Sequence, residues 1–338
     1  MKKESAAKKL GVPNIILFFA RYELVISLVV LLIAIVLPII VDKRYVTNIM
    51  INCATYGILA LSLNLLAGVM GTVSLGHAAF YGIGAYTAAL LATKFGTPFY
   101  LNFLAAMLIA GIFGLAVGMP TLRIKGKYLA LITMGFCEII RIVELNWVSL
   151  TRGPMGIINI PTFYLFGNKL SKPLPKFYIV LVCLLFTLYV VWAIVNSRIG
   201  RAVMTIRDDE LAAGFMGVNT YVYKVMIFGI SAALAGLAGA FYAHNVTFVD
   251  PKSFTFDQSI LFLSMIILGG MGSLPGAILG AIVMAVLPEL LRGFVEYRQV
   301  IYGFIIVFMV IFAPKGILGA YNTKYIRQRY HKLKDAAE

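Results

Sequence analysis

The stretch FYIVLVCLLFTLYVVWAIVN (177–196) decides the fold class, because its twenty consecutive residues include no charged side chain. At 1.5 Å of rise per residue, such a helix is about 30 Å long and spans the hydrocarbon core of a bilayer. Six further long apolar runs occupy 24–41, 46–67, 73–93, 99–118, 128–150 and 225–243. Three shorter apolar pieces lie near 259–270, 276–291 and 300–313. The sequence therefore predicts an all-α, polytopic membrane bundle with about ten transmembrane helices.

The first two short pieces leave two alternatives open. Each piece could cross the bilayer, or together they could form a re-entrant hairpin whose irregular turn is shielded inside the bundle. Composition excludes a soluble globule under either alternative. Apolar residues make up 61% of the 338 residues and charged residues 13%, against roughly 45–50% and 25% in soluble domains.

The distribution of basic residues predicts the orientation in the membrane. The net charge is +15, but Lys and Arg lie in short connectors and form no stripe with interleaved aromatic residues, which excludes nucleic-acid binding. With the N-terminus in the cytoplasm, 18 basic residues face inward and 10 face outward. The positive-inside rule then favours both termini inside. The predicted parts are a cytoplasmic or interfacial leader (1–23), a membrane domain (24–313) and a basic cytoplasmic tail (314–338).

Catalytic and metal-binding motifs are missing from the sequence. It contains neither GxxxxGK[ST], which would bind a nucleotide phosphate, nor HExxH, which would bind zinc. Cys53, Cys137 and Cys183 stand singly inside apolar runs, without the spacing of metal ligands. No catalytic, cofactor or metal site is predicted.

The connector SRIGRAVMTIRDDELAAGFMGVNTYVYK (197–224) is the longest one on the predicted cytoplasmic side. Its pattern predicts a short amphipathic helix that ends near Gly217. The predicted apolar stripe consists of Ala202, Val203, Ile206, Ala213 and Phe215, and the predicted solvated side chains are Arg201, Arg207, Asp208, Asp209 and Glu210. Such a helix could lie in the membrane interface, or it could dock on a cytoplasmic partner through its apolar face.

Three ionisable residues interrupt the run YLALITMGFCEIIRIVELNW (128–147), namely Glu138, Arg141 and Glu144. Because successive members are three residues apart, we expect them to share one helix face. A charge at the centre of a span costs roughly 2.5–3.5 kcal/mol, so a partner is expected. The group could be an ion pair that fixes the register of the bundle, or a polar station on a translocation path.

Small and polar residues also enter a span at TVSLGHAAFYGIGAY (72–86). His77 is expected to be a buried histidine with a satisfied hydrogen bond, with a place on the path as the alternative. Small residues recur at four-residue spacing, which is typical of close helix packing. The pairs are Gly114 with Gly118, Ala232 with Gly236, and Gly272 with Gly276, the last in GGMGSLPG (269–276), which indicates a broken helix or a close approach.

These stretches together resemble a known family, the M-type (LivM) permease subunits of branched-chain amino acid ABC importers. The segments that carry the resemblance are ALSLNLLAGVMGTVSLGHAAFYGIGAY (60–86), RIKGKYLALITMGFCEIIRIV (123–143), TRGPMGI (151–157), 197–243 and ILGGMGSLPGAILGA (267–281). The resemblance implies a permease in the bacterial inner membrane that binds no cofactor itself. Its implied partners are an H-type sister permease, two cytoplasmic ATPases that use ATP, and an extracytoplasmic amino-acid-binding protein.

The resemblance also gives the 197–224 connector a role as the coupling helix to an ATPase. Glu210, Ala212, Ala213 and Gly217 resemble the EAA-type coupling loop, with Leu211 inserted after the acid. Arg201, Arg207 and Asp208 precede them on the same segment. Related permeases for urea or short amides share much of this pattern and remain an alternative. An ion-coupled secondary transporter or an intramembrane enzyme that uses Glu138 or His77 are alternatives of another class.

Overall fold

The computed structural model describes residues 23–41, 43–122, 128–165, 168–170 and 172–290, with isolated positions between 301 and 317. The regular secondary structure in this part of the chain is helical apart from two short strands that form an antiparallel pair, β1 (Tyr164–Leu165) and β2 (Asn168–Lys169). The all-helical, polytopic prediction is therefore confirmed in outline. The leader 1–22, most of the apolar piece 300–313 and the tail from 318 lie outside the described residues.

The first half of the bundle contains six α-helices and two shorter helical segments. They are α3 (Glu23–Val41), α4 (Arg44–Leu63), the π-helix η1 (Asn64–Val69), α5 (His77–Lys94), α6 (Phe99–Thr121), α7 (Tyr128–Asn146), α8 (Val148–Thr151) and the 3-10 helix η2 (Gly153–Met155). The second half contains α9 (Pro173–Asn196), α10 (Arg198–Asp208), α11 (Glu210–Phe215), α12 (Thr220–Val246), the 3-10 helix η3 (Pro251–Phe254), α13 (Phe256–Gly269) and α14 (Leu274–Leu290).

Four helices in the described residues are long and apolar enough to cross a membrane, by length and composition. They are Arg44–Val69, which joins α4 to η1, Phe99–Thr121, Pro173–Asn196 and Thr220–Val246. Four of the other predicted runs form helices that fall short of this standard for identifiable reasons. α7 carries three ionisable residues, α5 has His77 and Lys94 at its ends, and α13 and α14 have 14 and 17 residues.

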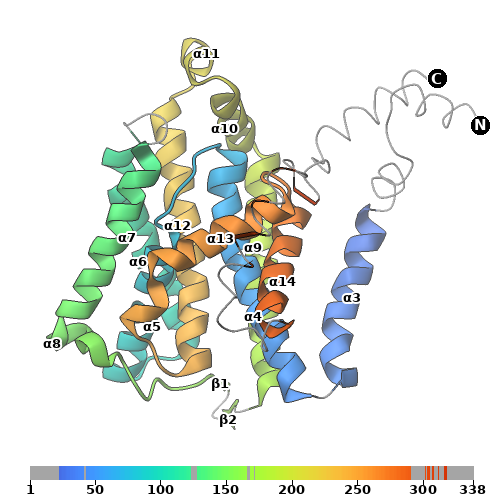
Figure 1. The fold of residues 1–338 in the computed structure, drawn as a ribbon, viewed down its shortest axis with the longest axis vertical. Coiled ribbons are helices and arrows are strands. Elements are labelled where there is room, and N and C mark those ends of the chain that lie inside the picture. The colour runs from blue at the N-terminus through green and yellow to red at the C-terminus, as the bar shows by residue number, and fades with distance from the viewer. Residues whose placement is uncertain are drawn as a thin grey trace, which may run out of the picture.

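α4 and α12 form the centre of the bundle (Figure 1). In the most apolar 18-residue stretch of each helix, 72% of the residues of α4 with η1 and 78% of those of α12 are buried. The corresponding shares for α6 and α9 are 33% and 28%. An apolar residue on α6 or α9 therefore faces outward as readily as inward. This is the arrangement of a membrane bundle, whose outer surface contacts lipid or a partner subunit.

Close helix packing at small residues is confirmed. A Cβ atom added to Gly84 on α5 would overlap the backbone of Gly236 on α12, and one added to Gly239 would overlap the carbonyl oxygen of Tyr81. α6 approaches α12 in the same way, because a Cβ atom on Gly114 would overlap that of Ala232. The missing side chains allow the three backbones to pack directly against one another.

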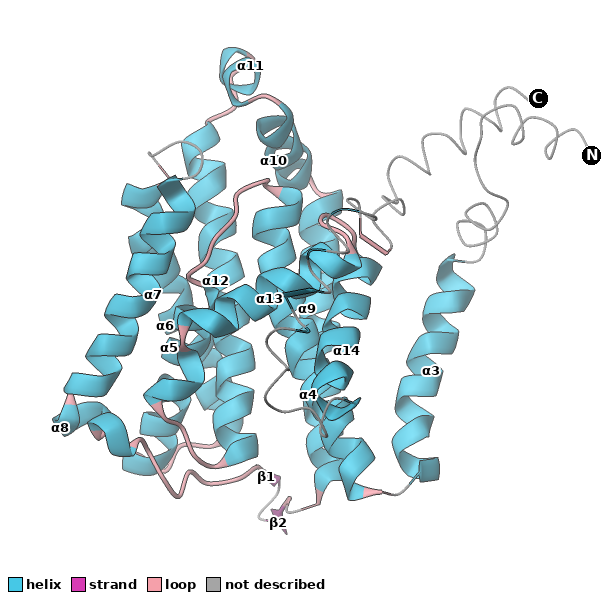
Figure 2. Ribbon diagram, viewed as in Figure 1, coloured by secondary structure: helices cyan, strands magenta, loops and turns pink. Residues whose placement is uncertain are grey.

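Two elements break in the interior of the bundle. The predicted span 73–93 becomes helical only at His77, and 70–76 runs as irregular chain from η1 to the start of α5 (Figure 2). α13 and α14 form a hairpin, and the turn 270–273 places Gly270 and Gly272 at φ values of 115° and 83°. At 1.5 Å per residue, α13 is about 21 Å long, which is shorter than a full crossing and supports the re-entrant alternative.

The connectors gather at two ends of the bundle (Figure 1). α10 and α11 lie at one end, where the Tyr221 hydroxyl on α12 donates to the carbonyl of Met119 on α6 at 2.8 Å. β1, β2, α8 and η3 lie at the opposite end, where Ile157 and Val249 form an isolated β-bridge. We call the first the α11 end and the second, after the β1–β2 hairpin and not the α13–α14 hairpin, the hairpin end.

Candidate functional site

The connector at the α11 end folds as two helices rather than one. Ser197 caps α10 by accepting a hydrogen bond from the Gly200 amide at 3.3 Å, and Val203 and Ile206 are buried. Asp209 then adopts an extended conformation, and its carboxylate accepts from the amides of Leu211 and Ala212 at 2.9 and 3.0 Å. Asp209 is therefore the cap that stops α10 and starts α11, because its side chain satisfies the first amides of the new helix.

α11 ends in a left-handed turn at Gly217, whose φ value is +81°. The Val218 amide donates to the carbonyl of Ala213 at 3.1 Å, and Ala213 itself is buried. A residue with a side chain would be strained at this φ, so the predicted stop at Gly217 has a definite backbone cause.

Three large apolar side chains at this tip point away from the bundle. Leu211, Phe215 and Met216 are 64%, 89% and 83% exposed. The prediction that Phe215 shares one apolar stripe with Val203, Ile206 and Ala213 is wrong, because those three residues are buried whereas the break at Asp209 and the turn at Gly217 present Phe215 outward. We call these three residues the apolar tip. An apolar surface of this kind, rimmed by charged residues, is typical of a docking site.

Charged contacts fix the position of this segment against the bundle. Glu210 pairs with Lys224 at the start of α12, with 2.6 Å between Oε2 and Nζ. The Arg207 guanidinium donates to the carbonyl of Gly68 in η1. Its long side chain thus joins α10 to the π-helix. Arg207 as a whole is nevertheless exposed, and so are Arg201, Asp208 and Asp209, as the sequence predicts. Ala212 is exposed too.

A buried asparagine that the sequence reading missed connects the two interior breaks. The Asn64 side chain accepts from the Gly272 amide at 2.8 Å and donates to the carbonyl of Ser273 at 3.2 Å. Asn64 lies in an apolar run, where a buried amide needs such partners. A polar residue inside an apolar run is the sequence signal that could have identified it. It holds the turn of the α13–α14 hairpin against η1.

His77 lies at the first turn of α5, next to this region. Its Nε2 lies 2.7 Å from the Ser62 hydroxyl, and the ring is buried. Ser231 of α12 donates to the carbonyl of Ser62 at 2.6 Å, which connects three helices. The expectation of a buried histidine with a satisfied hydrogen bond is confirmed.

The three ionisable residues of α7 separate into two environments. Glu138 and Arg141 form an ion pair on a partly open surface, with side chains 45% and 28% exposed. Glu144 is 5% exposed, and neither of its carboxylate oxygens has a hydrogen-bond partner among the described residues. The prediction of one shared face is wrong, because a six-residue separation rotates Glu144 by about 120° from Glu138 at 100° per residue.

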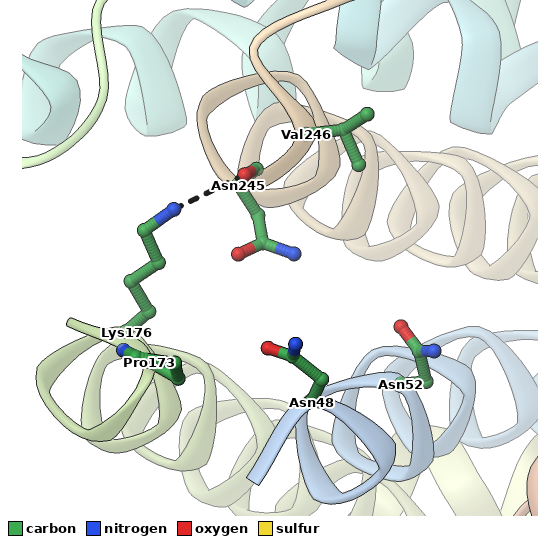
Figure 3. A pocket seen from close by; sticks show the side chains of 6 residues that line it. All are labelled: Asn48, Asn52, Pro173, Lys176, Asn245 and Val246. Atoms are coloured by element: carbon green, nitrogen blue, oxygen red, sulfur yellow. Dashed lines mark hydrogen bonds between the residues drawn. The ribbon is translucent and has the colours of Figure 1, made fainter. Parts of the chain in front are cut away.

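A polar pocket of about 430 Å³ opens at the hairpin end (Figure 3). Asn48 and Asn52 lie one turn apart on α4 and face Asn245 of α12 across the opening, with Lys176 of α9 at its rim. The Lys176 ammonium group donates to the carbonyl of Asn245 at 3.2 Å. The sequence reading missed this pocket, although Asn48 and Asn52 are polar residues at helical spacing inside an apolar run.

Groups of three or more His, Cys, Asp or Glu side chains that could hold a metal ion are not found among the described residues. Among the described residues, the buried polar side-chain atoms without a hydrogen-bond partner are both carboxylate oxygens of Glu144 and the hydroxyls of Tyr86 and Thr162.

Comparisons with known proteins place these features in a wider context. A family model described as "Branched-chain amino acid transport system / permease component" matches residues 45–313. The chain is 37% identical to the high-affinity branched-chain amino acid transport system permease protein LivM of Salmonella typhimurium over 311 residues, which cover 85% of this chain and 73% of that protein.

More distant relatives match over a similar length. The permease protein LivH of the same organism is 27% identical over 79% of this chain and 92% of its own. A probable branched-chain amino acid transport permease protein LivM of Methanocaldococcus jannaschii is 20% identical over 81% of this chain and 93% of its own. No solved structure matches the chain with significance.

Proposed function

Because the chain belongs to the permease components of branched-chain amino acid transport systems, we propose that it forms one half of the membrane pore of an ATP-driven importer. The resemblance drawn from the sequence motifs is confirmed. The protein is a multi-pass membrane protein whose function is transport rather than catalysis. ATP hydrolysis then belongs to partner subunits, and the substrate is a branched-chain or related amino acid.

The apolar tip carries this proposal. Leu211, Phe215 and Met216 stand out from the bundle at the end that the basic residues assign to the cytoplasm. Apolar side chains that project into water are unfavourable, and a groove on a partner would bury them. We assign that groove to a cytoplasmic ATPase, with Glu210, Ala212, Ala213 and Gly217 shaping the helix and Arg201, Arg207 and Asp208 forming its charged flank.

The partners follow from the same reading. An H-type sister permease would complete the pore, two ATPases would bind one coupling helix each, and a binding protein would deliver the amino acid at the hairpin end. The orientation is N-in and C-in with about ten crossings in the bacterial inner membrane. Among the α7 residues, Glu144 is the candidate for the translocation path, and Glu138 with Arg141 sets the register of the bundle.

The test of this function is co-purification followed by transport. The tagged chain is extracted from its native membranes, and bound ATPases are identified by mass spectrometry. The variant Phe215→Ser with Met216→Ser should weaken ATPase binding about a hundredfold or more, since two buried apolar side chains contribute roughly 1.5–3 kcal/mol each. Met155→Ser is the matched control, because Met155 is 82% exposed at the hairpin end.

Transport distinguishes the alternative classes. The purified complex in proteoliposomes should take up leucine only with internal ATP and external binding protein. Uptake by the chain alone, driven by a proton or sodium gradient, would instead establish a secondary transporter. Uptake of urea or acetamide in preference to leucine would keep the ATP-driven mechanism and change the substrate.

A further inference from the structure

Glu144 is a carboxylate held inside the bundle without a hydrogen-bond partner. Its side chain is 5% exposed, and both oxygens lack a partner among the described residues. The backbone around it is well fixed, because the Thr151 hydroxyl donates to the carbonyl of Glu144 at 2.7 Å. The carboxylate is therefore a defined feature at the end of α7 and not the tip of a frayed helix.

Nearby charged groups are already engaged. Arg141, one turn away, is paired with Glu138 on a different face of α7. Asp250 accepts hydrogen bonds from the amide and hydroxyl of Ser253 at 2.8 and 2.9 Å. Arg141 therefore makes no ion pair with the Glu144 carboxylate, and Asp250, which is also an acid, can supply no compensating positive charge.

Gly82 on α5 makes room for this carboxylate. A Cβ atom on Gly82 would lie 2.8 Å from Oε1 of Glu144 and 3.0 Å from Cγ of Phe254. The carboxylate and the ring of Phe254 therefore converge on the same point of α5. Tyr86, one turn further along the same face of α5, has a buried hydroxyl without a hydrogen-bond partner among the described residues.

Three tyrosine rings pack against the ring of Phe254. The ring centroid of Phe254 lies 5.2 Å from that of Tyr81, 6.0 Å from that of Tyr86 and 5.9 Å from that of Tyr242. Aromatic faces attract cations, and a carboxylate does so more strongly, especially away from water. We call Glu144, Tyr81, Tyr86, Tyr242 and Phe254 the aromatic box.

We propose that the aromatic box binds the ammonium group of the amino acid as it passes through the permease. This inference rests on the proposed function, since it assigns a site to the substrate of that function. A primary ammonium group offers three donors and a full positive charge, which match the Glu144 carboxylate, the Tyr86 hydroxyl and the ring faces. A divalent cation fits less well, because Ca²⁺ takes six to eight oxygen ligands.

The position of the box agrees with this role. Its residues come from α5, α7, α12 and η3, and Glu144 lies at the end of α7 that leads into α8 at the hairpin end (Figure 1). That end faces outward in the proposed orientation, so the box would meet the amino acid soon after its release from the binding protein. A buried carboxylate without a cation is costly, and the arriving ammonium group would relieve this cost.

The test separates the amino group of leucine from its carboxylate. The complete transport complex is purified without binding protein, and its unfolding temperature is measured with isopentylamine, leucine or 4-methylpentanoate. These probes share one branched side chain and carry, respectively, the amine alone, both groups, and the carboxylate alone. We expect isopentylamine and leucine to raise the unfolding temperature of the wild-type complex, and 4-methylpentanoate to leave it unchanged.

Variants then locate the site. Glu144→Gln should raise the half-maximal isopentylamine concentration about tenfold or more, because it removes the charge that pairs with the amine. Asp257→Asn is the matched control, since this carboxylate is exposed at the first turn of α13, and it should bind the amine as the wild type does. Gly82→Ala, which crowds the carboxylate without removing it, should also weaken amine binding.

Two results would overturn the proposal. One is a wild-type complex that responds to 4-methylpentanoate but not to isopentylamine, a comparison that needs no variant. The other is an equal amine response in wild type and Glu144→Gln. ATP-driven leucine uptake by the same preparation tests the proposed function separately, because its absence in the wild type would leave the amine-binding result as it stands.

Discussion

Glu138 and Arg141 form their ion pair on the surface of α7, while Glu144, one turn further, is buried. The ion pair and the Glu144 carboxylate therefore lie in different environments. A lone charge on a surface that faces lipid or another subunit is unfavourable. The buried carboxylate faces protein on every side.

This arrangement predicts a double-variant test of the surface pair. Glu138→Gln or Arg141→Gln alone should reduce the amount of assembled complex, because the surviving charge loses its partner at a depth where it costs roughly 2.5–3.5 kcal/mol. The double variant should recover much of the loss. The measurement is the yield of complex by size-exclusion chromatography, normalised to membrane-inserted chain. Two singles that assemble like the wild type would mean that the pair faces water.

The sequence predicts the surroundings of a residue when its side chain needs a particular partner, as a polar side chain inside an apolar run does. His77 in an apolar run had to find a partner, and it did so in Ser62. Asn64 carried the same signal in an equally apolar run. Phe215 could not be placed, because helical periodicity identifies an apolar face but does not tell whether the bundle, lipid or another subunit covers it.

At the scale of elements, α5, α6 and α12 pack through glycine and alanine. The Gly84 contact predicts a clear stability effect. Gly84→Ala should destabilise the protein by about 1–3 kcal/mol, because the added methyl group meets the backbone of Gly236 and neither helix can yield easily. The measurement is thermal unfolding of the purified chain or complex.

Gly135→Ala is the matched control for this prediction. Gly135 also lies inside a helix, α7, but no described atom lies within 4 Å of the position of its added Cβ. Alanine there should be neutral or stabilise the helix by up to about 1 kcal/mol. Equal effects of the two substitutions on thermal stability would show that the packing of α5 against α12 does not depend on the backbone contact at Gly84.

The ion pair between Glu210 and Lys224 allows a charge-reversal test of the proposed coupling role of α11. Glu210→Lys should lower leucine uptake per ATP hydrolysed, because like charges would then push α11 away from α12. The local cost is on the order of 1 kcal/mol for a pair of which only Glu210 is partly exposed. Adding Lys224→Glu should restore much of the coupling. A double variant as impaired as the single one would remove the pair from the coupling mechanism.

The existence of most helices was predictable, and their interruptions were less so. The apolar runs located α4, α6, α9 and α12 to within a few residues. The break at Asp209 depends on one side chain that caps two amides, and the irregular chain at 70–76 depends on contacts with α7, where the Thr133 hydroxyl accepts from the Leu75 amide at 3.0 Å. Such tertiary contacts leave no periodic signal in the sequence.

At the scale of the whole molecule, the two ends of the bundle should face opposite sides of the membrane. Met155 and Phe215 are 82% and 89% exposed at opposite ends, which makes them suitable reporters. In intact cells with a permeable outer membrane, a membrane-impermeant maleimide should label Met155→Cys and spare Phe215→Cys. Inverted vesicles should give the reverse result. Labelling of both positions from one side would contradict the proposed orientation.

The contact between Arg207 and η1 has a consequence for how force travels through the protein. One guanidinium group connects α10 to Gly68, and Asn64, one turn earlier in the same π-helix, holds the turn of the α13–α14 hairpin. A displacement of the apolar tip would therefore be transmitted through Arg207 and the few residues from Gly68 back to Asn64. The turn of that hairpin contains two glycines at positive φ, Gly270 and Gly272, so a small movement of α10 would be passed on to α13 and α14.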